Sequence, residues 1–229
     1  MREVIEDLST PEQEQAAARS QCYRVLGAAF SYPEGEMSEA IRSGELAQVL
    51  EAAVCAVDPG LGAEVEWGAL REGGGDDDLA VEFTRLFDVG ASGPPCPLNG
   101  GLYGGARMKV MEEAVRFYNH FGLHLDEAQR ELPDHLQTEL EFMHYLAFRE
   151  TESLACGEDP GPYRRAQRDF VARHPGRFVP LLRERLEKQE PMPYFRELVG
   201  LLAGFLERDL RHLMAVTVEA SEATFPGPI

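Results

Sequence analysis

The residues best placed to do chemistry are an aspartate and a histidine at the predicted start of a helix. Asp134 and His135 follow Pro133, and proline is favoured at the first position of a helix, where its missing N–H is not needed. We therefore expect both side chains in the first turn, where the helix dipole stabilises a carboxylate and disfavours an imidazolium. Glu139 lies four residues further on the same face and could hold the histidine proton. The pair could act as acid and base or hydrogen-bond a ligand, and a helix cap with a surface histidine is the structural alternative.

Catalysis by this pair would need further groups that the sequence does not supply. A serine hydrolase needs a nucleophile, and no Gly-x-Ser-x-Gly elbow occurs. A phosphate-binding loop needs Gly-Lys-Ser or Gly-Lys-Thr after a strand, and the glycine-rich segment of this chain has no such sequence and follows a helix. We therefore expect no catalytic residues and a protein that is not an enzyme.

Metal chemistry is the enzymatic alternative. A metal-dependent helical hydrolase or oxygenase would use Glu139, Glu141, His144 and His135. Glu141 and His144 form a Glu-x-x-His unit, which di-iron four-helix bundles use twice. The unit occurs once in this chain, so we expect neither a metal nor another cofactor.

The composition narrows the choice of partner and location. The chain has 22 Lys and Arg against 40 Asp and Glu, a net charge of −18, which disfavours nucleic acid and anionic membranes and favours cationic partners. The longest apolar run, 198–206, is far shorter than the roughly 20 residues that span a bilayer, so no stable membrane insertion is expected. The acidic N-terminus lacks the order of an export signal, which predicts the cytoplasm.

The apolar periodicity is helical along nearly the whole chain, and no segment alternates as a strand does. The sequence thus predicts an all-α fold: one globular domain of about seven to nine helices over residues 1–220, with a disordered tail at 221–229. Helices are expected at about 11–32, 38–57, 79–87, 105–121, 133–155, 162–173, 176–188 and 193–217.

The connection 90–105 is unusual because it has six glycines and three prolines in sixteen residues. Long connections in compact domains are usually functional or disordered. The prolines stiffen the first half, and the glycines allow the backbone to approach another group closely. We therefore expect a loop of defined shape.

Four sequence blocks occur in order along the chain. They are Glu-Phe-Thr-Arg-Leu-Phe at 82–87, Pro-Cys-Pro at 95–97 with Tyr103, Val-Arg-Phe-Tyr at 115–118 with Gly-Leu at 122–123, Pro-Asp-His at 133–135 and Glu-Leu-Glu-Phe-Met at 139–143, and Phe-Val-Ala-Arg-His at 170–174 with Phe-Val-Pro at 178–180. Taken together and in this order, the blocks resemble the TorD/DmsD/NarJ family. The chain departs from the family at Gly100 and Gly101, where relatives often have Glu-Ser, and at Pro175 and Phe178, which replace a leucine and a tryptophan.

The resemblance implies an all-helical cytoplasmic chaperone for a molybdenum-cofactor oxidoreductase. Such a protein binds the twin-arginine signal or the apo form of the catalytic subunit and holds it for cofactor insertion. The proline-cysteine-proline-leucine form is most similar to chaperones that serve selenate, chlorate or ethylbenzene enzymes. The client-binding residues that the resemblance implies are Glu82, Arg85, Phe87, Pro95, Pro97, Tyr103, Asp134, His135, Glu139 and His174.

We expect these residues to form a groove for the client. Asp134, His135 and Glu139 would be its polar rim, and the segment from Pro95 to Tyr103 would close over one end. A helical adaptor with no molybdoenzyme client is a third hypothesis. The sequence favours neither a monomer nor a dimer, and it assigns no contact with nucleotide or molybdenum cofactor.

Overall fold

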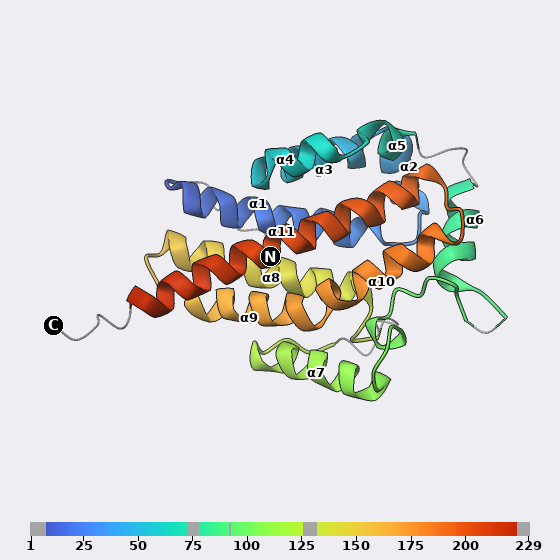
Figure 1. Cartoon of the computed structure of the whole chain (residues 1–229). Coiled ribbons are helices and arrows are strands. Elements are labelled where there is room, and N and C mark those ends of the chain that lie inside the picture. The colour runs from blue at the N-terminus through green and yellow to red at the C-terminus, as the bar shows by residue number, and fades with distance from the viewer. Residues whose placement is uncertain (1–7, 73–77, 92, 126–131, 224–229) are drawn as a thin grey trace.

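The chain folds into a bundle of helices, as expected for an all-α protein (Figure 1). The computed structural model describes residues 8–72, 78–91, 93–125 and 132–223, with side chains to 218. Within these ranges no strand is formed, and eight helices have eight residues or more, in agreement with the predicted seven to nine. The α-helices are α1 (Pro11–Ala29), α2 (Gly35–Arg42), α3 (Glu45–Val57), α4 (Pro59–Glu64), α5 (Trp67–Arg71), α6 (Asp78–Phe83), α7 (Arg107–His120), α8 (Leu136–Ala155), α9 (Gly161–Arg173), α10 (Pro175–Glu187) and α11 (Pro193–Ala223).

Two short turns complete the secondary structure around the loop. A π-helical turn, η1 (Thr84–Asp88), follows α6 directly, and a 3-10 turn, η2 (Gly100–Leu102), lies inside the loop 90–105. The helix expected at 79–87 is therefore α6 followed by η1. Helix α11 runs to Ala223, three residues into the expected tail, and residues 224–229 lie outside the described part of the chain.

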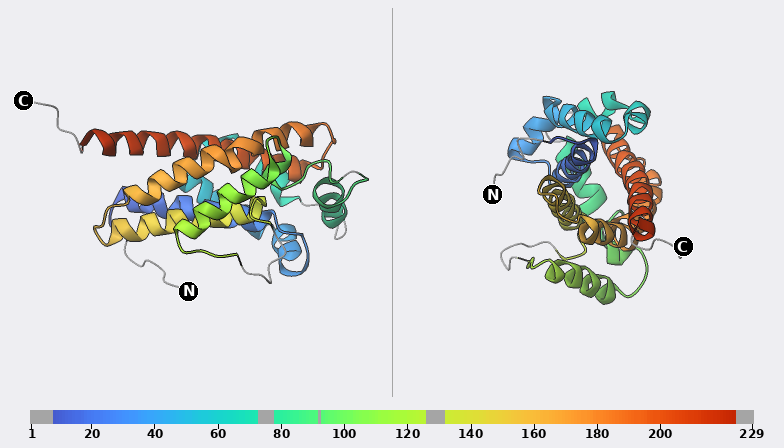
Figure 2. Two further views of the ribbon diagram at one scale, coloured as in Figure 1. Left: turned by 90° about the horizontal axis from the view of Figure 1, so that it is seen from below. Right: turned by 90° about the vertical axis from the view of Figure 1, so that its left-hand side faces the viewer.

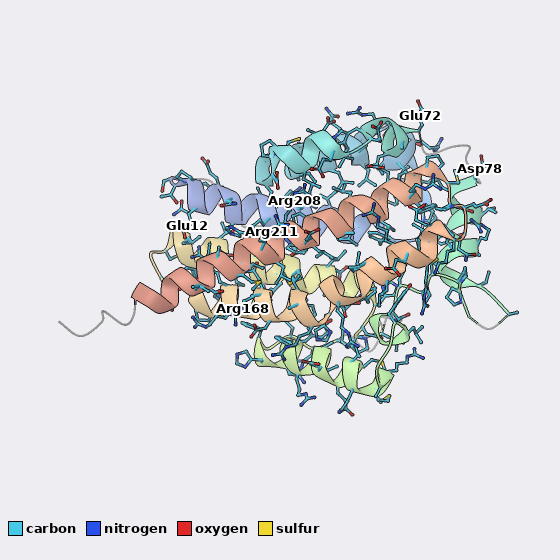
Figure 3. All side chains as sticks on the ribbon, viewed as in Figure 1. Glu12, Glu72, Asp78, Arg168, Arg208 and Arg211 are labelled. Carbon is cyan, nitrogen blue, oxygen red and sulfur yellow. The ribbon has the colours of Figure 1, made fainter. Side chains whose placement is uncertain are left out.

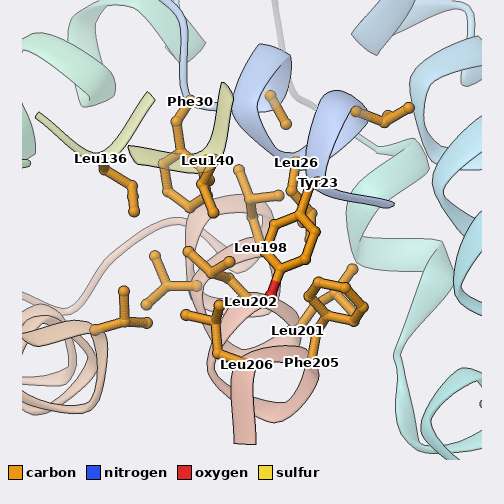
Figure 4. Close-up of a cluster of buried hydrophobic side chains, with 14 of the residues drawn as sticks. Tyr23, Leu26, Phe30, Leu136, Leu140, Leu198, Leu201, Leu202, Phe205 and Leu206 are labelled. Carbon is orange, nitrogen blue, oxygen red and sulfur yellow. The ribbon is translucent and has the colours of Figure 1, made fainter. Parts of the chain in front are cut away.

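The core lies between the long helices. Helix α1 packs on α8 and α3, and α11 packs on α9 and α10. Figure 4 shows apolar side chains of α1, α8 and α11 meeting in this core. In the end-on view of Figure 2, α3 lies on one side of the bundle and α7 on the opposite side. The labelled core residues are Tyr23, Leu26, Phe30, Leu136, Leu140, Leu198, Leu201, Leu202, Phe205 and Leu206, all buried.

Charged side chains are abundant on the outside of the bundle (Figure 3). Arg208 of α11, for example, pairs with Glu64 of α4 at 2.7 Å and with Asp58 at 3.1 Å. Within the described ranges, no helix combines the length and the apolar character needed to cross a bilayer.

A charged group is also enclosed in the core, which the sequence did not indicate. Arg19 of α1 is buried and donates hydrogen bonds to Asp209 of α11 at 2.5 Å, to Glu150 of α8 at 2.8 Å and to Gln167 of α9 at 2.6 Å. The hydroxyl of Tyr23 donates to the same aspartate at 2.5 Å. This buried network joins four helices through directed hydrogen bonds.

Candidate functional site

Asp134 holds the loop 90–105 in shape. Its carboxylate is buried and accepts hydrogen bonds from the Gly101 backbone N–H at 2.9 Å and from the Asn99 side-chain amide at 3.2 Å. The Gly100 N–H donates to the Asp134 carbonyl at 2.9 Å. The sequence analysis placed Asp134 on the polar rim of a groove. In the structure its side chain is buried and does not lie on a rim. It is an internal acceptor for the loop.

The helix begins later than Pro133, contrary to the prediction. His135 is the N-cap of α8, with extended backbone angles (φ −75°, ψ 137°), and its Nδ1 accepts the Gln137 N–H at 3.3 Å. The physical reason is the loop: His135 pairs with Asn99 as an isolated antiparallel bridge, and the Leu136 N–H donates to a loop carbonyl at 2.7 Å. A backbone N–H can only donate, so Nδ1 is unprotonated and the imidazole is held in one orientation.

The Glu139 side chain points into the core and not toward His135. Its carboxyl is fully buried, and Oε1 lies 3.4 Å from Nδ1 of His174, which is also buried. Burial, with a smaller contribution from Asp134, raises the pKa of Glu139 well above its usual range. Burial lowers the pKa of His174 to about 4, so the imidazole is neutral at pH 7. The imidazole stacks on Phe170 at a centroid distance of 4.4 Å. The expected placement of Glu139 at a groove rim is wrong, because the side chain has no access to solvent.

Glu82 and Arg85 form an ion pair that ties η1 to the connection between α10 and α11. Two guanidinium nitrogens donate to the Glu82 carboxylate at 2.6 and 2.8 Å. The carboxylate also accepts the Met192 N–H at 3.0 Å, and Arg85 donates to the Gln189 carbonyl at 3.1 Å. The hydrogen bond from Arg85 lowers the pKa of Glu82. The pair thus fixes the position of the aromatic residues that flank it.

Three predicted residues, Phe87, Pro97 and His135, come together in one pocket of about 480 Å³, hereafter the end pocket. It lies where the end of α1, the α6–η1 segment, the loop and the start of α8 converge. The aromatic lining is Phe30, Tyr32, Phe83 and Phe87; the other apolar lining is Pro94, Pro97, Leu98 and Leu102; the polar lining is Asp88, Asn99, His135 and Gln137.

The aromatic wall of the end pocket is held by ring contacts. Phe83 makes edge-on contacts with Tyr32 at 5.5 Å and with Phe87 at 5.1 Å between centroids. Phe87 in turn contacts Phe195 of α11 at 5.4 Å. Tyr32 is 43% exposed, whereas the phenylalanines are buried. The wall therefore presents one exposed ring, that of Tyr32, which packs against buried rings.

Tyr103 belongs to the loop, but its side chain does not line the end pocket. Its buried ring packs on Phe178 at 5.4 Å, and the guanidinium of Arg185 covers it at 4.2 Å. A Cβ on Gly100 would lie 2.9 Å from Cδ1 of Phe178. The two departures from the family pattern, at Gly100 and Phe178, are therefore spatial neighbours. Pro95 is half-buried beside the pocket and does not line it.

Several pocket residues were not predicted, although weak signals were present. Phe83 belongs to the 82–87 block and Asp88 follows it directly. Asn99 stands beside the glycine pair, and Tyr32 precedes the proline expected to stop the first helix. None of these positions has a spacing that reveals a shared pocket, because their contacts are long-range.

The four residues of the metal hypothesis do not converge. Glu141 is exposed and accepts a hydrogen bond from Gln137 at 3.2 Å, and His144 lies 2.9 Å from the Ser20 hydroxyl. Glu139 lies by His174 and His135 caps α8. Among the described residues, no group of three or more His, Cys, Asp or Glu is arranged to hold a metal ion.

The fold is an all-α bundle with the end pocket where α1, the α6–η1 segment, the loop and α8 converge. The sequence model described as "Nitrate reductase delta subunit" matches residues 37–184. The chain belongs to this family. The resemblance drawn from the four sequence blocks is thereby confirmed.

Individual relatives carry related names. The chain is 33% identical to the chlorate reductase assembly chaperone protein of Ideonella dechloratans over 73% of this chain and 76% of that protein. It is 33% identical to the selenate reductase assembly chaperone protein of Thauera selenatis over 72% and 75% of the two chains. The dimethyl sulfide dehydrogenase assembly chaperone protein of Rhodovulum sulfidophilum is 31% identical over 90% and 86%.

Proposed function

We propose that this chain is a non-enzymatic cytoplasmic chaperone for the catalytic subunit of a molybdenum-cofactor oxidoreductase. It binds the twin-arginine signal or the apo form of that subunit and holds it for cofactor insertion before assembly or export. The observation that carries the proposal is the end pocket, in which Phe87, Pro97 and His135 meet. The names of the relatives, which are reductase and dehydrogenase assembly chaperones, support it.

The chemistry of the site suits binding better than catalysis. The Asp134 carboxylate is used by the loop, and Nδ1 of His135 is used by its own helix. Glu139 and His174 are enclosed in the core, and burial disfavours the charged form of both groups. We therefore assign Phe87, Pro97 and His135 to direct client contact. The other predicted residues do not line the pocket.

The client fits the charge and the surface of the chain. A twin-arginine signal combines arginines with an apolar stretch, and the end pocket combines an aromatic wall with polar acceptors. The net charge of −18 would speed the approach of a cationic segment more than it would strengthen the final complex. Apolar anchors in a pocket supply most of the affinity of such interfaces.

Affinity purification from the native host tests the proposal. We expect the tagged chain to capture one large catalytic subunit, identified by mass spectrometry. Tyr32→Ala removes the open ring of the end pocket and should reduce capture several-fold. Leu181→Ala is the matched control, because Leu181 is similarly exposed, 39% against 43%, and lies on α10 away from the pocket.

Two results would contradict the proposal. Equal capture by both variants would show that the end pocket does not bind the client. Stoichiometric iron, manganese or zinc in protein purified without chelators would instead favour the metal-dependent hydrolase or oxygenase.

A further inference from the structure

We infer that the end pocket is a guanidinium site that receives an arginine side chain of the bound partner. The inference deepens the proposed function and rests on it for the identity of the partner. It is carried by three features of the pocket: an unpaired carboxylate, side-chain amides whose nitrogens are already engaged, and aromatic rings beside them. Each feature selects against a different competing ligand.

The carboxylate is that of Asp88, which ends η1 at the pocket mouth. Asp88 is exposed, and among the described residues no group donates a hydrogen bond or forms an ion pair with it. The lining contains no lysine and no arginine. An acidic group with no internal partner, in a wall without cationic side chains, favours a cation from outside.

The two amide side chains add acceptors. The Asn99 Nδ2 donates to Asp134, and the Gln137 Nε2 donates to Glu141 at 3.2 Å. A carboxylate can only accept, so in both residues the nitrogen must face the acid. The carbonyl oxygens, Oδ1 of Asn99 and Oε1 of Gln137, are thereby left to accept from a ligand. Together with Asp88 they form a set of acceptors suited to a ligand with several N–H donors.

The aromatic rings distinguish a guanidinium from an ammonium group. Guanidinium is planar and weakly hydrated, and it stacks on aromatic faces while its five N–H groups donate in the plane. Tyr32 offers a ring that is 43% exposed, and Phe83 and Phe87 hold that side of the pocket in place. The volume of about 480 Å³ lies within the range of roughly 300–1,000 Å³ usual for ligand sites and admits a long side chain with part of its backbone.

Two other hollows of the surface lack this combination. The hollow between α7 and α9, of about 540 Å³, is lined by Arg116 and Arg165, which would repel a cation. The hollow along α7, of about 550 Å³, has Met108, Met111 and Val115 with one arginine and one glutamate. A smaller pocket of about 240 Å³ has the rings of Tyr118, Phe142 and Tyr145, but its carboxylate, that of Glu141, already accepts a hydrogen bond from Gln137. The end pocket therefore differs from these three hollows in having aromatic rings beside an unpaired carboxylate.

Isothermal titration calorimetry with defined peptides tests the inference. The probe is a blocked peptide of two adjacent arginines followed by four leucines. Its counterparts carry lysines, citrullines or two further leucines in place of the arginines. We expect the full chain to bind the arginine peptide about tenfold more tightly than the citrulline peptide, which keeps the shape and loses the charge.

The protein variants separate a local contact from the overall charge. Asp88→Asn should weaken binding of the arginine peptide about tenfold and abolish the preference over citrulline. Glu158→Gln removes the same charge from an exposed site in the α8–α9 connection and should change the affinity by less than about twofold. Circular dichroism verifies that both variants keep the helical fold.

Three outcomes would overturn the inference: equal affinity for arginine and lysine peptides, equal or tighter binding of the leucine peptide, or the same effect from Asp88→Asn and Glu158→Gln. Absence of binding by the arginine peptide would overturn it as well. A chain that captures its catalytic subunit in the host and fails these titrations refutes the guanidinium site alone. A chain that passes them and captures no such subunit refutes the proposed function alone.

Discussion

A single buried carboxylate, that of Asp134, determines the shape of one wall of the end pocket. Its two oxygens accept hydrogen bonds from Gly101 and Asn99, which belong to the loop. Hydrogen bonds to a charged group contribute roughly 1.5–3 kcal/mol when their partners are buried. The path of the loop therefore depends on this residue, and so does the position of the Asn99 amide that faces a ligand.

Close packing at Gly101 leads to the first prediction. A Cβ at this position would lie 2.8 Å from the Asp134 Oδ2 and 3.2 Å from the Arg107 Cα. Gly101→Ala should therefore lower the free energy of unfolding by about 1–3 kcal/mol, because the loop must move away from its acceptor. Urea denaturation followed by circular dichroism measures the loss.

The same substitution at Gly200 is the matched control, because it should change the free energy of unfolding in the opposite direction. Gly200 lies inside α11, and a Cβ added to it meets no atom within 4 Å. Gly200→Ala should raise the free energy of unfolding by roughly 0.5–1 kcal/mol through helix propensity. Two variants of equal stability would contradict the account of the loop.

The buried Glu139 leads to a prediction about pH. Burial raises its pKa in the folded state, so the folded chain retains a proton that the unfolded chain releases above a pH of about 4.5. Stability from this group is present at low pH and is lost as the pH rises, by about 1.4 kcal/mol per unit until the folded-state pKa is reached. The Glu139→Gln variant has no such proton to release. Its free energy of unfolding relative to that of the parent chain should therefore increase between pH 5 and pH 8.

Urea titrations at the two pH values check the prediction, and Glu141→Gln is the control on the same helix. Glu141 is exposed, and its change should leave the pH dependence of stability as it was. The opposite pKa shift of His174, lowered to about 4, costs stability as the pH falls below about 6.5 in all three proteins. A Glu139→Gln advantage that shrinks with rising pH would show that the carboxyl is ionised in the fold.

At the scale of elements, α10 fastens the loop from the side opposite Asp134. Arg185 donates to the Leu102 carbonyl at 3.3 Å and covers the Tyr103 ring, and Arg177 donates to the Gly104 carbonyl at 3.1 Å. Among its described residues the loop forms no helix or strand apart from η2, and yet it is held by α10 and by Asp134 in the segment that leads into α8. This agrees with the sequence prediction of a loop with a defined shape.

Arg185→Ala should loosen this attachment. The loss of one hydrogen bond and one cation–π contact at a half-buried site corresponds to about 1 kcal/mol. Amide exchange of Leu102, Tyr103 and Gly104 should accelerate by about fivefold while exchange in α8 stays the same. Arg183→Ala is the control, because Arg183 lies on an exposed part of the same helix. Equal exchange in both variants would show that α10 does not fasten the loop.

The elements were more predictable from sequence than their contacts. The periodicity of apolar residues located α1, α3 and α7 to α11, because burial of one face leaves a local pattern. The start of α8 was misplaced by three residues, since Pro133 is a strong local signal and the competing pairing of His135 with Asn99 is made across 36 residues. Local sequence signals carry no information about such a long-range pairing.

The sequence likewise predicted only part of the candidate site correctly. Phe87, Pro97 and His135 were predicted and meet in the end pocket. Glu82 was predicted as a binding residue and is used to hold η1, and Glu139 was expected at a rim and lies inside the core. A motif indicates that a residue type is needed at a position, and only the packing shows whether its side chain faces a ligand or a neighbouring helix.

At the scale of the whole molecule, the charged network around Arg19 joins helices that are distant in sequence. Its partners Glu150 and Asp209 are 131 and 190 residues away, and Gln167 is 148 residues away. In the sequence, Arg19 reads as one more polar residue of an amphipathic helix. Its burial follows only from the way four helices enclose it.

Replacement of this arginine by an apolar residue of similar length is the last prediction. Arg19→Met leaves the carboxylates of Asp209 and Glu150 in the core without their shared cation. Loss of one partner from a buried ionic group costs about 3–5 kcal/mol, so the urea midpoint should fall markedly. Arg24→Met on the exposed face of α1 is the control and should change stability by less than about 0.5 kcal/mol.

The pH dependence of this deficit distinguishes lost charge pairing from lost packing. In the parent chain burial raises the pKa of Glu150, and the charges around it, Arg19 first among them, outweigh burial and lower it. Without Arg19 the pKa of Glu150 should rise, so that the folded variant takes up a proton that the unfolded chain does not hold. Stability of the variant should then decrease as the pH rises from 5 to 8, and the deficit relative to the parent chain should be smaller at pH 5. A deficit of equal size at both pH values would mean that Arg19 acts through packing of its side chain, because packing does not depend on protonation.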